Sequence, residues 1–398
     1  MPKKTIRDIV VQGKTILVRV DFNLPQDPRT GQISDDTRIR ASLSTINYLL
    51  DQKSKVVLCS HWGRPDGKVV ESLRMAPVAN RLSELIRRPV PVAPDCVGPE
   101  VEKMAAMLQP GEILFLENLR FHKEEEKNEP GFAQSLAKLG EIFVNDAFGT
   151  THRAHASTAG VARYLPAVAG FLLEKELEML GKALNNPIRP FASIIGGAKV
   201  SDKIAVLQNI LTKVDVLLIG GGMANTFLAA QGYPVGQSLL EQDRVSFARE
   251  LLEKAKTRRV RLLLPEDVVV SEKLDAISQT QTVSVSKVPP SAKIGDIGPQ
   301  TIANYSLELR KCNTVIWNGP LGIFELPPFA AGTQAIARML STLKGATTVV
   351  GGGSTAEAVE SLGLADKITH VSTGGGASLE FMEGKVLPGV EVLLEKRP

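Results

Sequence analysis

The sequence predicts an α/β protein of two Rossmann-like domains, each a parallel sheet covered by helices on both faces, joined by a hinge helix. The 398 residues are too many for one compact core of ordinary size. Short apolar, β-branched runs alternate with helical stretches along both halves, as in parallel sheets buried on both faces. Polar and glycine residues follow these runs directly, and ligands of such sheets bind at the carboxyl ends of strands.

In the first half, four apolar runs predict strands: TILVRV (15–20), KVVLCS (55–60), ILFLENL (113–119) and EIFVNDAF (141–148). In the second half, six runs do so: FASIIGG (191–197), VDVLLIGG (214–221), RLLLPEDVVV (261–270), TVIWNG (314–319), TTVVGGG (347–353) and THVSTGGG (369–376). Between the halves, leucines at helical spacing predict a connecting helix from Phe171 to Leu184, ended by Asn185-Asn186-Pro187. We therefore expect domains at 1–169 and 188–387, with the interdomain helix at 170–187.

The composition is that of a soluble globular protein, with 43% apolar and 23% charged residues. No apolar stretch is long enough for a membrane span, and the first ten residues do not resemble a signal peptide, so we expect a cytoplasmic protein without membrane partners. The net charge of +4 is too small to indicate nucleic acid. The scattered Cys59, Cys96 and Cys312 argue against a disulfide framework and against a zinc cluster.

Arginines and histidines collect after the strands of the first half. Guanidinium groups with imidazole donors suit a small, multiply charged anion, and Asp21 and Asn23 suit a substrate hydroxyl. No Cys or carboxylate stands at metal-ligand spacing from His61, His152 and His155, so we expect structural histidines at these positions and no metal site. The run Glu124-Glu125-Glu126 is most simply a solvated surface. The polar residues that follow the strands of the first half are Arg19, Asp21, Asn23, Arg38, His61, Arg64, Arg120, His122, His152, Arg153 and His155.

Glycines collect after the strands of the second half, at five corners that begin at Gly196, Gly220, Gly319, Gly351 and Gly374. Bare backbone N–H groups at such corners suit a polyphosphate and a flat base, so a nucleotide is the simplest ligand. The spacing of Lys199 and Lys203 predicts that both ammonium groups project from one face of a helix, where a bound anion would neutralise their charge. The alternative is that both lysines are simply solvated. Ser354 or Thr355 is expected to cap the helix after Gly351-Gly352-Gly353. P-loop, dinucleotide-binding GxGxxG, protein-kinase and GxSxG hydrolase motifs are absent from the sequence.

Over nearly its whole length the chain resembles phosphoglycerate kinases. The matching motifs occur in the family's order: RVDFN, SHWGRP, LRFHKEEE, AFGTTHRAH, GGAKVSDKI, GGGMANTFL, WNGPLGIFE and VSTGGGASLE. The resemblance implies reversible phosphoryl transfer between 1,3-bisphosphoglycerate and ADP, giving 3-phosphoglycerate and ATP, with Mg2+. It also implies a monomer that binds 3-phosphoglycerate in the N-terminal domain and nucleotide in the C-terminal domain. The last residues, 388–398, are expected to return to the first domain.

The resemblance also assigns site residues by position. The phosphoglycerate set is Asp21, Phe22, Asn23, Arg38, His61, Trp62, Gly63, Arg64, Arg120 and Arg153. The nucleotide set is Gly197, Lys199, Lys203, Gly221, Asn318, Pro320, Glu325, Gly352, Gly353, Ser354 and Thr355, with Glu325 on the ribose hydroxyls. The catalytic set is Arg38, Lys199, Gly374 and Gly375.

Two positions depart from the family's pattern. Trp62 stands where an aliphatic residue is expected, and Ser354 stands where the family usually has an aspartate that helps to hold the metal. A hydroxyl can contact Mg2+ directly or through water but adds no charge, and Asp202 could compensate. Because of Ser354, a second hypothesis is a nucleotide-dependent binding or scaffold protein that does not catalyse turnover. A third hypothesis is a small-molecule kinase of another class. No general base is needed for the leading reading, because the attacking carboxylate is already ionised.

Overall fold

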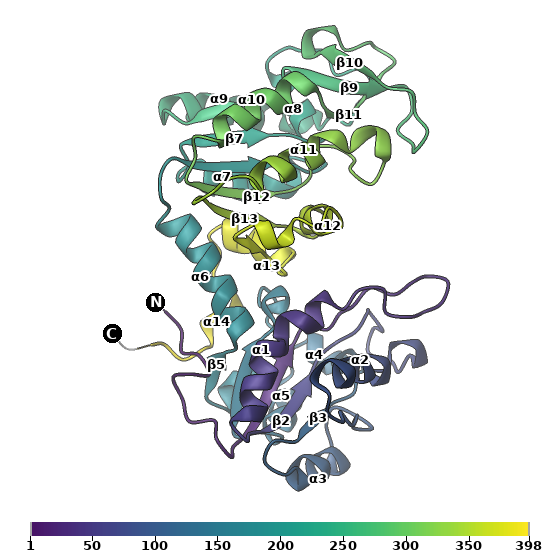
Figure 1. Ribbon diagram of the computed structural model, residues 1–398, viewed down its shortest axis with the longest axis vertical. Helices are drawn as coiled ribbons and strands as arrows, with labels where there is room; N and C mark the ends of the chain where they lie inside the picture. Colours follow the sequence, from purple (N-terminus) through teal and green to yellow (C-terminus); the bar gives the residue numbers. More distant parts are fainter. Residues whose placement is uncertain (1, 397–398) are drawn as a thin grey trace. The chain divides into compact units, whose positions relative to one another are not determined.

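The computed structural model describes residues 2–396, and the chain divides into two compact units (Figure 1). Unit 1 comprises Met1–Glu178 and Val386–Pro398, and unit 2 comprises Met179–Lys385. Helix α6 (Phe171–Asn185) contains the boundary between Glu178 and Met179, where the sequence predicts the connecting helix. No helix within residues 2–396 is both long and apolar enough to cross a membrane.

Unit 1 contains a parallel sheet in the order β3-β2-β1-β4-β5. Its central strand β1 pairs in register with β2 on one side, where Val18 faces Leu58, and with β4 on the other, where Val18 faces Val144. All the strands run in the same direction, so their carboxyl ends share one edge of the sheet. The strands are β1 (Thr15–Val20), β2 (Lys55–Cys59), β3 (Ile113–Phe115), β4 (Ile142–Asp146) and β5 (Ala167–Ala169).

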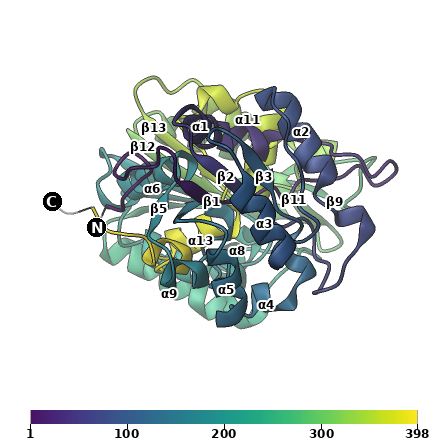
Figure 2. The ribbon, with the colours of Figure 1, turned by 90° about the horizontal axis from the view of Figure 1, so that it is seen from below.

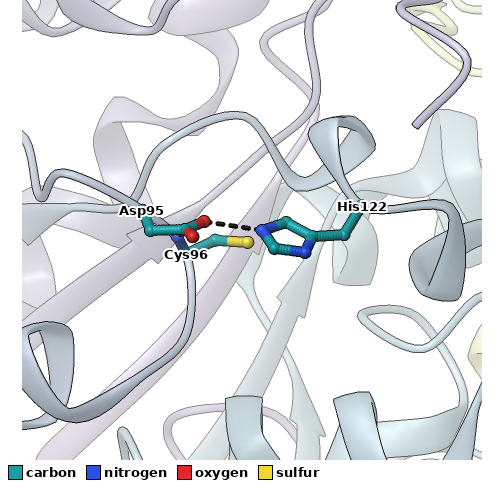
Figure 3. Close-up of side chains that lie close together, drawn as sticks. All are labelled: Asp95, Cys96 and His122. Atoms are coloured by element: carbon teal, nitrogen blue, oxygen red, sulfur yellow. Dashed lines mark hydrogen bonds and ion pairs between the residues drawn. The ribbon is translucent and has the colours of Figure 1, made fainter. Parts of the chain in front are cut away.

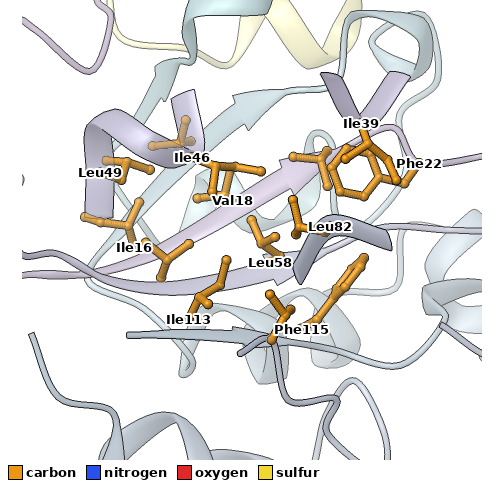
Figure 4. Packing of buried hydrophobic residues seen from close by; sticks show 14 of the residues in the cluster. Ile16, Val18, Phe22, Ile39, Ile46, Leu49, Leu58, Leu82, Ile113 and Phe115 are labelled. Carbon is orange, nitrogen blue, oxygen red and sulfur yellow. The ribbon is translucent and has the colours of Figure 1, made fainter. Parts of the chain in front are cut away.

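One face of this sheet packs against helices α1 (Thr37–Asp51) and α2 (Ala76–Ile86), and Figure 4 shows the side chains that meet there. Ile16 and Val18 of β1 contact Ile46 and other apolar residues of the helices. Leu17, which points to the opposite face, is only 1% exposed. Burial on both faces explains the unbroken apolar runs, and each buried aliphatic side chain stabilises the fold by about 1.5–3 kcal/mol.

The helices of unit 1 cover the sheet and connect its strands (Figure 2). The α-helices are α1 (Thr37–Asp51), α2 (Ala76–Ile86), α3 (Pro99–Met107), α4 (Lys123–Glu126), α5 (Pro130–Ala137) and α14 (Pro388–Glu391). The 3-10 helices are η1 (Glu71–Leu73), η2 (Leu119–Phe121), η3 (Phe148–Thr150) and η4 (Gly160–Arg163).

The C-terminal segment is hydrogen-bonded to unit 1. The amide of Lys4 donates to Leu394 O (2.7 Å), and the amide of Leu394 donates to Ala167 O (2.9 Å). The side chain of Asn145 donates to Gly389 O at 3.0 Å. The segment predicted to return to the first domain, 388–398, extends two residues beyond the described chain, because 397 and 398 lie outside it.

Unit 2 contains a second parallel sheet in the order β14-β13-β12-β6-β7-β8 and a smaller antiparallel sheet in the order β10-β9-β11. The run RLLLPEDVVV contributes to both sheets, since it is divided at Pro265 into β8 and β9. The parallel strands are β6 (Phe191–Ile195), β7 (Val216–Ile219), β8 (Arg261–Leu263), β12 (Thr314–Asn318), β13 (Thr347–Gly351) and β14 (His370–Val371). The antiparallel strands are β9 (Asp267–Ser271), β10 (Gln281–Ser284) and β11 (Lys293–Ile297).

Helices of unit 2 pack on its parallel sheet around a core that includes Trp317, Tyr305 and Ile336. The α-helices are α7 (Ile204–Ile210), α8 (Ala224–Ala230), α9 (Val245–Thr257), α10 (Pro299–Leu309), α11 (Ala331–Leu340), α12 (Gly353–Ser361) and α13 (Gly376–Met382). The 3-10 helices are η5 (Ser201–Lys203), η6 (Gln242–Arg244), η7 (Val285–Lys287), η8 (Pro327–Phe329) and η9 (Ala365–Lys367).

Candidate functional site

Asp21, directly after β1, is the centre of a polar cluster in unit 1. Its Oδ2 accepts a hydrogen bond from Arg38 Nη1 at 2.7 Å, and Arg38 comes from the first turn of α1. Its Oδ1 is buried, lies 3.9 Å from His61 Nδ1 and has no hydrogen-bond partner among residues 2–396. An unpaired buried carboxylate oxygen is costly, so this atom is suited to accept a hydrogen bond from a ligand hydroxyl.

His61, directly after β2, is held as a neutral ring with a defined tautomer. Arg19 Nη2 lies 3.1 Å from His61 Nδ1, and a guanidinium can only donate, so Nδ1 accepts and the proton is on Nε2. The pKa of His61 lies well below its usual range, mainly because the ring is buried and also because of the charges of Arg19, Arg120 and Arg38. Nε2–H is therefore available as a neutral hydrogen-bond donor.

Arg19 itself is 1% exposed, which the sequence-based site sets do not anticipate. Its Nε donates to Ser157 Oγ at 2.8 Å, and Ser157 Oγ donates to Glu125 Oε1 at 2.5 Å. Glu125 is also 1% exposed, so the prediction that residues 124–126 form a solvated surface is wrong at that position. Burial raises the pKa of Glu125, and the nearby Arg19 charge opposes that rise. This carboxyl group lies close enough to balance the charge of the buried guanidinium.

Gly63 joins two further members of the cluster through its backbone. Its N–H donates to Asn23 Oδ1 at 2.8 Å, and its carbonyl accepts from Arg120 Nη1 at 3.1 Å. Gly63 has φ +65°, and a Cβ there would lie 2.8 Å from a methyl group of Leu73. Asn23 and Arg120 are thereby positioned at the same edge of the sheet as Asp21.

The other members of the phosphoglycerate set differ in exposure. Arg64 and Arg153 are exposed, which leaves their guanidinium groups available to an anion. Phe22 is fully buried and packs edge-on against Phe115, so only its backbone faces the cluster. Trp62 is 1% exposed, and its Nε1–H donates to Leu24 O at 2.8 Å. The indole thus fills the core, which accounts for an apolar residue being expected at this position.

In unit 2, glycine corners at the carboxyl ends of β6 and β7 pack backbone against backbone. Gly197 (φ +109°) donates its N–H to Pro320 O at 2.9 Å and accepts a hydrogen bond from the Met223 amide at 3.0 Å. Gly221 has φ +68°, and a Cβ there would lie 2.6 Å from Gly197 O. Only glycine fits such a close approach, so this part of the site is built from main chain.

Lys203 and Asn318 form a buried polar pair beside these corners. The ammonium of Lys203 donates to Asn318 O (3.2 Å) and to Asn318 Oδ1. Burial lowers the pKa of Lys203 to about 8, with the Asp202 charge acting in the opposite direction. Asn318 is 2% exposed, and its Nδ2 finds no hydrogen-bond partner in the described chain. An unused donor and a desolvated cation together favour an anionic ligand.

The corner after β13 does not form as predicted. Gly352, with φ +90°, is the N-cap of α12, and neither Ser354 nor Thr355 makes a side-chain capping bond. Thr355 Oγ1 instead accepts from the Gly319 amide at 2.8 Å, which joins this corner to the end of β12. Ser354 and Gly353 are exposed, as expected of residues that a ligand could contact.

Lys199 and Lys203 do not share a helical face, so that prediction is wrong. Helix α7 begins only at Ile204, and Lys199 lies in an irregular segment before η5. Glu241 holds this segment, since its Oε2 accepts from the amides of Val200 (2.5 Å) and Ser201 (3.1 Å). Lys199 is left exposed. Burial is the largest single influence on the pKa of Glu241 and raises it, but the hydrogen bonds from this segment and the charge of Lys199 together lower the pKa below its usual value.

A cavity of about 460 Å³ lies within unit 2, next to these corners. Aliphatic side chains such as Leu228 and Val268 line it together with glycine backbone, as suits a flat apolar base. Several members of the nucleotide set line the same cavity: Gly197, Gly221, Pro320, Glu325 and Ser354.

Gly374 and Gly375 follow the end of β14. The N–H of Gly374 already donates to Ser372 Oγ at 3.1 Å. Gly375, with φ +48°, is the N-cap of α13. Of these two predicted catalytic groups, the amide of Gly375 is therefore the better placed to meet a ligand.

Comparison with known proteins identifies the family of the chain. The family model described as "Phosphoglycerate kinase" matches residues 6–385. The chain is 58% identical over 396 residues to a phosphoglycerate kinase of Moorella thermoacetica and 57% identical over 396 residues to one of Pelotomaculum thermopropionicum, with 100% of each chain covered in both cases. The solved structure of phosphoglycerate kinase from Coxiella burnetii matches with a TM-score of 0.89 and 41% identity, covering 98% of both chains. The chain belongs to the phosphoglycerate kinase family.

Proposed function

We propose that unit 1 binds 3-phosphoglycerate and unit 2 binds ADP or ATP, and that the phosphoryl group passes in line between them after domain closure. Reversible phosphoryl transfer between 1,3-bisphosphoglycerate and ADP is the reaction of the family to which the chain belongs. One observation supports the assignment of ligands to units. Each parallel sheet has, at its carboxyl edge, a buried polar atom without a partner in the described residues, Asp21 Oδ1 in unit 1 and Asn318 Nδ2 in unit 2.

The two atoms differ in the ligand group they suit. Asp21 Oδ1 is an acceptor among arginines, so it suits a hydroxyl on a ligand whose charged ends are neutralised by guanidinium groups. Asn318 Nδ2 is a donor beside an ammonium group and glycine backbone, so it suits a phosphate oxygen. A hydroxy acid phosphate and a nucleotide match these two chemistries.

Catalysis by this chain requires positioning and charge neutralisation rather than proton transfer. The attacking carboxylate of 3-phosphoglycerate is ionised at neutral pH, so no general base is needed. We assign neutralisation of the transferred phosphoryl group to Arg38, Lys199 and the backbone at Gly374 and Gly375. Because an acyl phosphate is readily hydrolysed, closure around both ligands must also exclude water.

Mg2+ fits the donor groups available in unit 2. The Ser354 hydroxyl lines the cavity, and the exposed carboxylate of Asp202 acts electrostatically on Lys203. Hard oxygen donors of this kind suit Mg2+, which keeps several waters and binds largely through substrate phosphates. When bound, the ion would neutralise polyphosphate charge. We further infer, from the family resemblance, a monomer that acts in the cytoplasm.

A coupled assay with 3-phosphoglycerate and Mg-ATP tests the proposal. We expect turnover that saturates with both substrates and is lost when other phosphorylated acids replace 3-phosphoglycerate. Nucleotide binding without turnover would instead favour the binding or scaffold protein that the Ser354 position leaves open. Turnover with a different acid would favour a small-molecule kinase of another specificity.

A further inference from the structure

Three side chains with different donor atoms meet in unit 1 (Figure 3). One ligand atom from each of Asp95, Cys96 and His122 lies within 4.8 Å of the others. His122 Nε2 is 2.7 Å from Asp95 Oδ1. Asp95 and Cys96 lie in the bend before α3, and His122 follows η2, so the fold joins residues that are far apart in the sequence. Metal-ligand spacing along the chain therefore could not reveal this group.

We propose that Asp95, Cys96 and His122 form a binding site for a borderline-soft divalent cation such as Zn2+. One thiol, one imidazole and one carboxylate are the ligands that Zn2+ takes in proteins, whereas Mg2+ prefers an all-oxygen set. Three protein ligands leave a fourth position for water. The partly exposed side chains of Asp95 (46%) and His122 (29%) provide access from solvent.

The donor atoms lie within 4.8 Å of one another and would have to shift to reach the spacing of a metal site. In a tetrahedral zinc site the donor atoms lie about 3.3–3.6 Å apart, because Zn–S is about 2.3 Å and Zn–N and Zn–O are about 2.0–2.1 Å. The Asp95–His122 separation of 2.7 Å would have to widen by roughly 0.6 Å to reach that spacing. Both of these side chains are partly exposed and can move, whereas Cys96 is fully buried and provides a fixed anchor. The ring of Phe132, 5.3 Å from that of His122, limits how far the imidazole can turn.

The charges also balance. Without metal, burial and the Asp95 and Glu125 charges raise the pKa of the Cys96 thiol, and the hydrogen bond that the His122 ring donates to Asp95 raises the pKa of His122. Both shifts favour the protonated forms, so a cation has to compete with protons at these two ligands. A divalent cation would displace the thiol proton and the Nε2 proton of His122 to solvent. The product has a thiolate, a neutral imidazole, a carboxylate and the cation, which together carry no net charge, so no unbalanced charge is buried.

The proposed cation site is distinct from the phosphoglycerate cluster. His122 lies two residues after Arg120, but the guanidinium of Arg120 turns to Gly63 O, whereas the imidazole of His122 turns to Asp95. His122 is one of the basic residues that follow the strands of unit 1, but none of the three proposed ligands belongs to the sets that the family resemblance assigns to phosphoglycerate, nucleotide or catalysis. The site can therefore be tested without relying on enzyme activity.

The test is a Co2+ titration of the untagged full-length protein after chelator treatment, with Mg2+ in excess. We expect one Co2+ per chain, a thiolate-to-cobalt charge-transfer band in the near ultraviolet, and the intense visible bands of four-coordinate Co2+. Stoichiometric Zn2+ should abolish these bands. Cys96→Ser should remove the charge-transfer band, while the matched control Cys312→Ser, which changes a buried thiol of unit 2, should retain it.

Two variants at the exposed ligands keep the test independent of the buried thiol. Asp95→Asn and His122→Gln should each weaken Co2+ binding at least tenfold while the circular dichroism spectrum stays native. Three results would overturn the proposal: no thiolate band in the unmodified chain, a band that persists in folded Cys96→Ser, or affinities within twofold of the original in both exposed-ligand variants.

Discussion

The two units present the same edge of a parallel sheet to a ligand, but they build it from different parts of the chain. In unit 1, side chains hold side chains, as in the contacts of Asp21 with Arg38 and of Arg19 with His61. In unit 2, backbone holds backbone, as in the approach of Gly221 to Gly197. Guanidinium groups provide full charges for a small anion, whereas glycine corners provide close N–H groups and room for a large ligand. Substitutions should therefore act differently in the two units.

The largest effect is expected from Arg38→Ala in unit 1. Loss of this guanidinium removes charge stabilisation assigned mainly to the transition state, so kcat should fall about 10²–10³-fold with a smaller change in KM. Arg40→Ala is the matched control, because Arg40 lies on the same helix, is exposed and pairs with Asp36 at 2.8 Å. Steady-state kinetics with both substrates measures the difference. Equal losses in kcat and in substrate affinity would indicate that Arg38 contributes to substrate binding and not specifically to the transition state.

Gly221→Ala should produce the next largest effect, in unit 2. The left-handed backbone conformation and the contact of the new Cβ with Gly197 O should lower the free energy of unfolding by about 2–5 kcal/mol in total. Gly363→Ala is the control, since Gly363 has φ +64° but no atom within 4 Å of a Cβ, and it should cost only about 1–2 kcal/mol. Urea unfolding measures both values. If the two variants were equally stable, the close backbone approach would not matter.

Arg19→Lys should separate positioning from direct binding in unit 1. Lysine keeps the charge but not the fork that bonds both Ser157 and His61, so the imidazole should lose its fixed tautomer. We expect KM for 3-phosphoglycerate to rise about tenfold with kcat changed less. NMR of the His61 ring nitrogens should show a mixture of tautomers in the variant. A single unchanged Nε2–H tautomer would show that Arg19 does not orient the ring.

The pKa of Lys203 predicts how nucleotide affinity depends on pH. In the free protein this pKa is about 8, so the ammonium is formed below pH 8 and affinity should be constant there. Bound phosphate would raise the pKa, so binding above pH 8 must take up a proton, and affinity should fall by up to tenfold per pH unit. Calorimetry in buffers of different ionisation enthalpy detects this uptake. Lys203→Met should abolish the uptake, whereas Lys199→Met, at an exposed lysine, should preserve it.

Ser354→Asp should have the smallest effect. A carboxylate at this position adds a charged oxygen ligand, so the apparent affinity for Mg2+ in the presence of ADP should increase about three- to tenfold. Glu357→Asp, at an exposed residue of the same helix, is the control. Turnover measured against total Mg2+ gives both values. An unchanged Mg2+ dependence would place Ser354 outside the metal site.

β5, which is only three residues long, and β10 and β11 of the antiparallel sheet are not among the predicted strands. The other strands and the polar residues that follow them could be predicted from the sequence because both parallel sheets are buried on both faces. Each strand then reads as one apolar run, and the chemistry begins where the run ends, as at Asp21 and Gly197. The run at 261–270 was harder to interpret, because its two halves have similar composition but enter different sheets.

What the sequence could not provide were contacts between distant segments. Arg19 is linked to the carboxyl group of Glu125 through the hydroxyl of Ser157, which is distant from both in the sequence. In the sequence Glu125 belongs to an acidic run typical of a surface, but in the fold its side chain is buried. Whether Lys199 and Lys203 share a helical face depends on the residue at which α7 begins. That residue is hard to predict from the sequence, because no side chain caps the helix. The convergence of Cys96 with His122 is of the same kind.

A crystal structure with 3-phosphoglycerate and Mg-ADP tests most directly whether each unit has its own ligand. We expect the 3-phosphoglycerate hydroxyl within hydrogen-bond distance of Asp21 Oδ1, and a phosphate oxygen of ADP within the same distance of Asn318 Nδ2. Both ligands in one unit, or both of these atoms still without a ligand contact, would contradict this expectation.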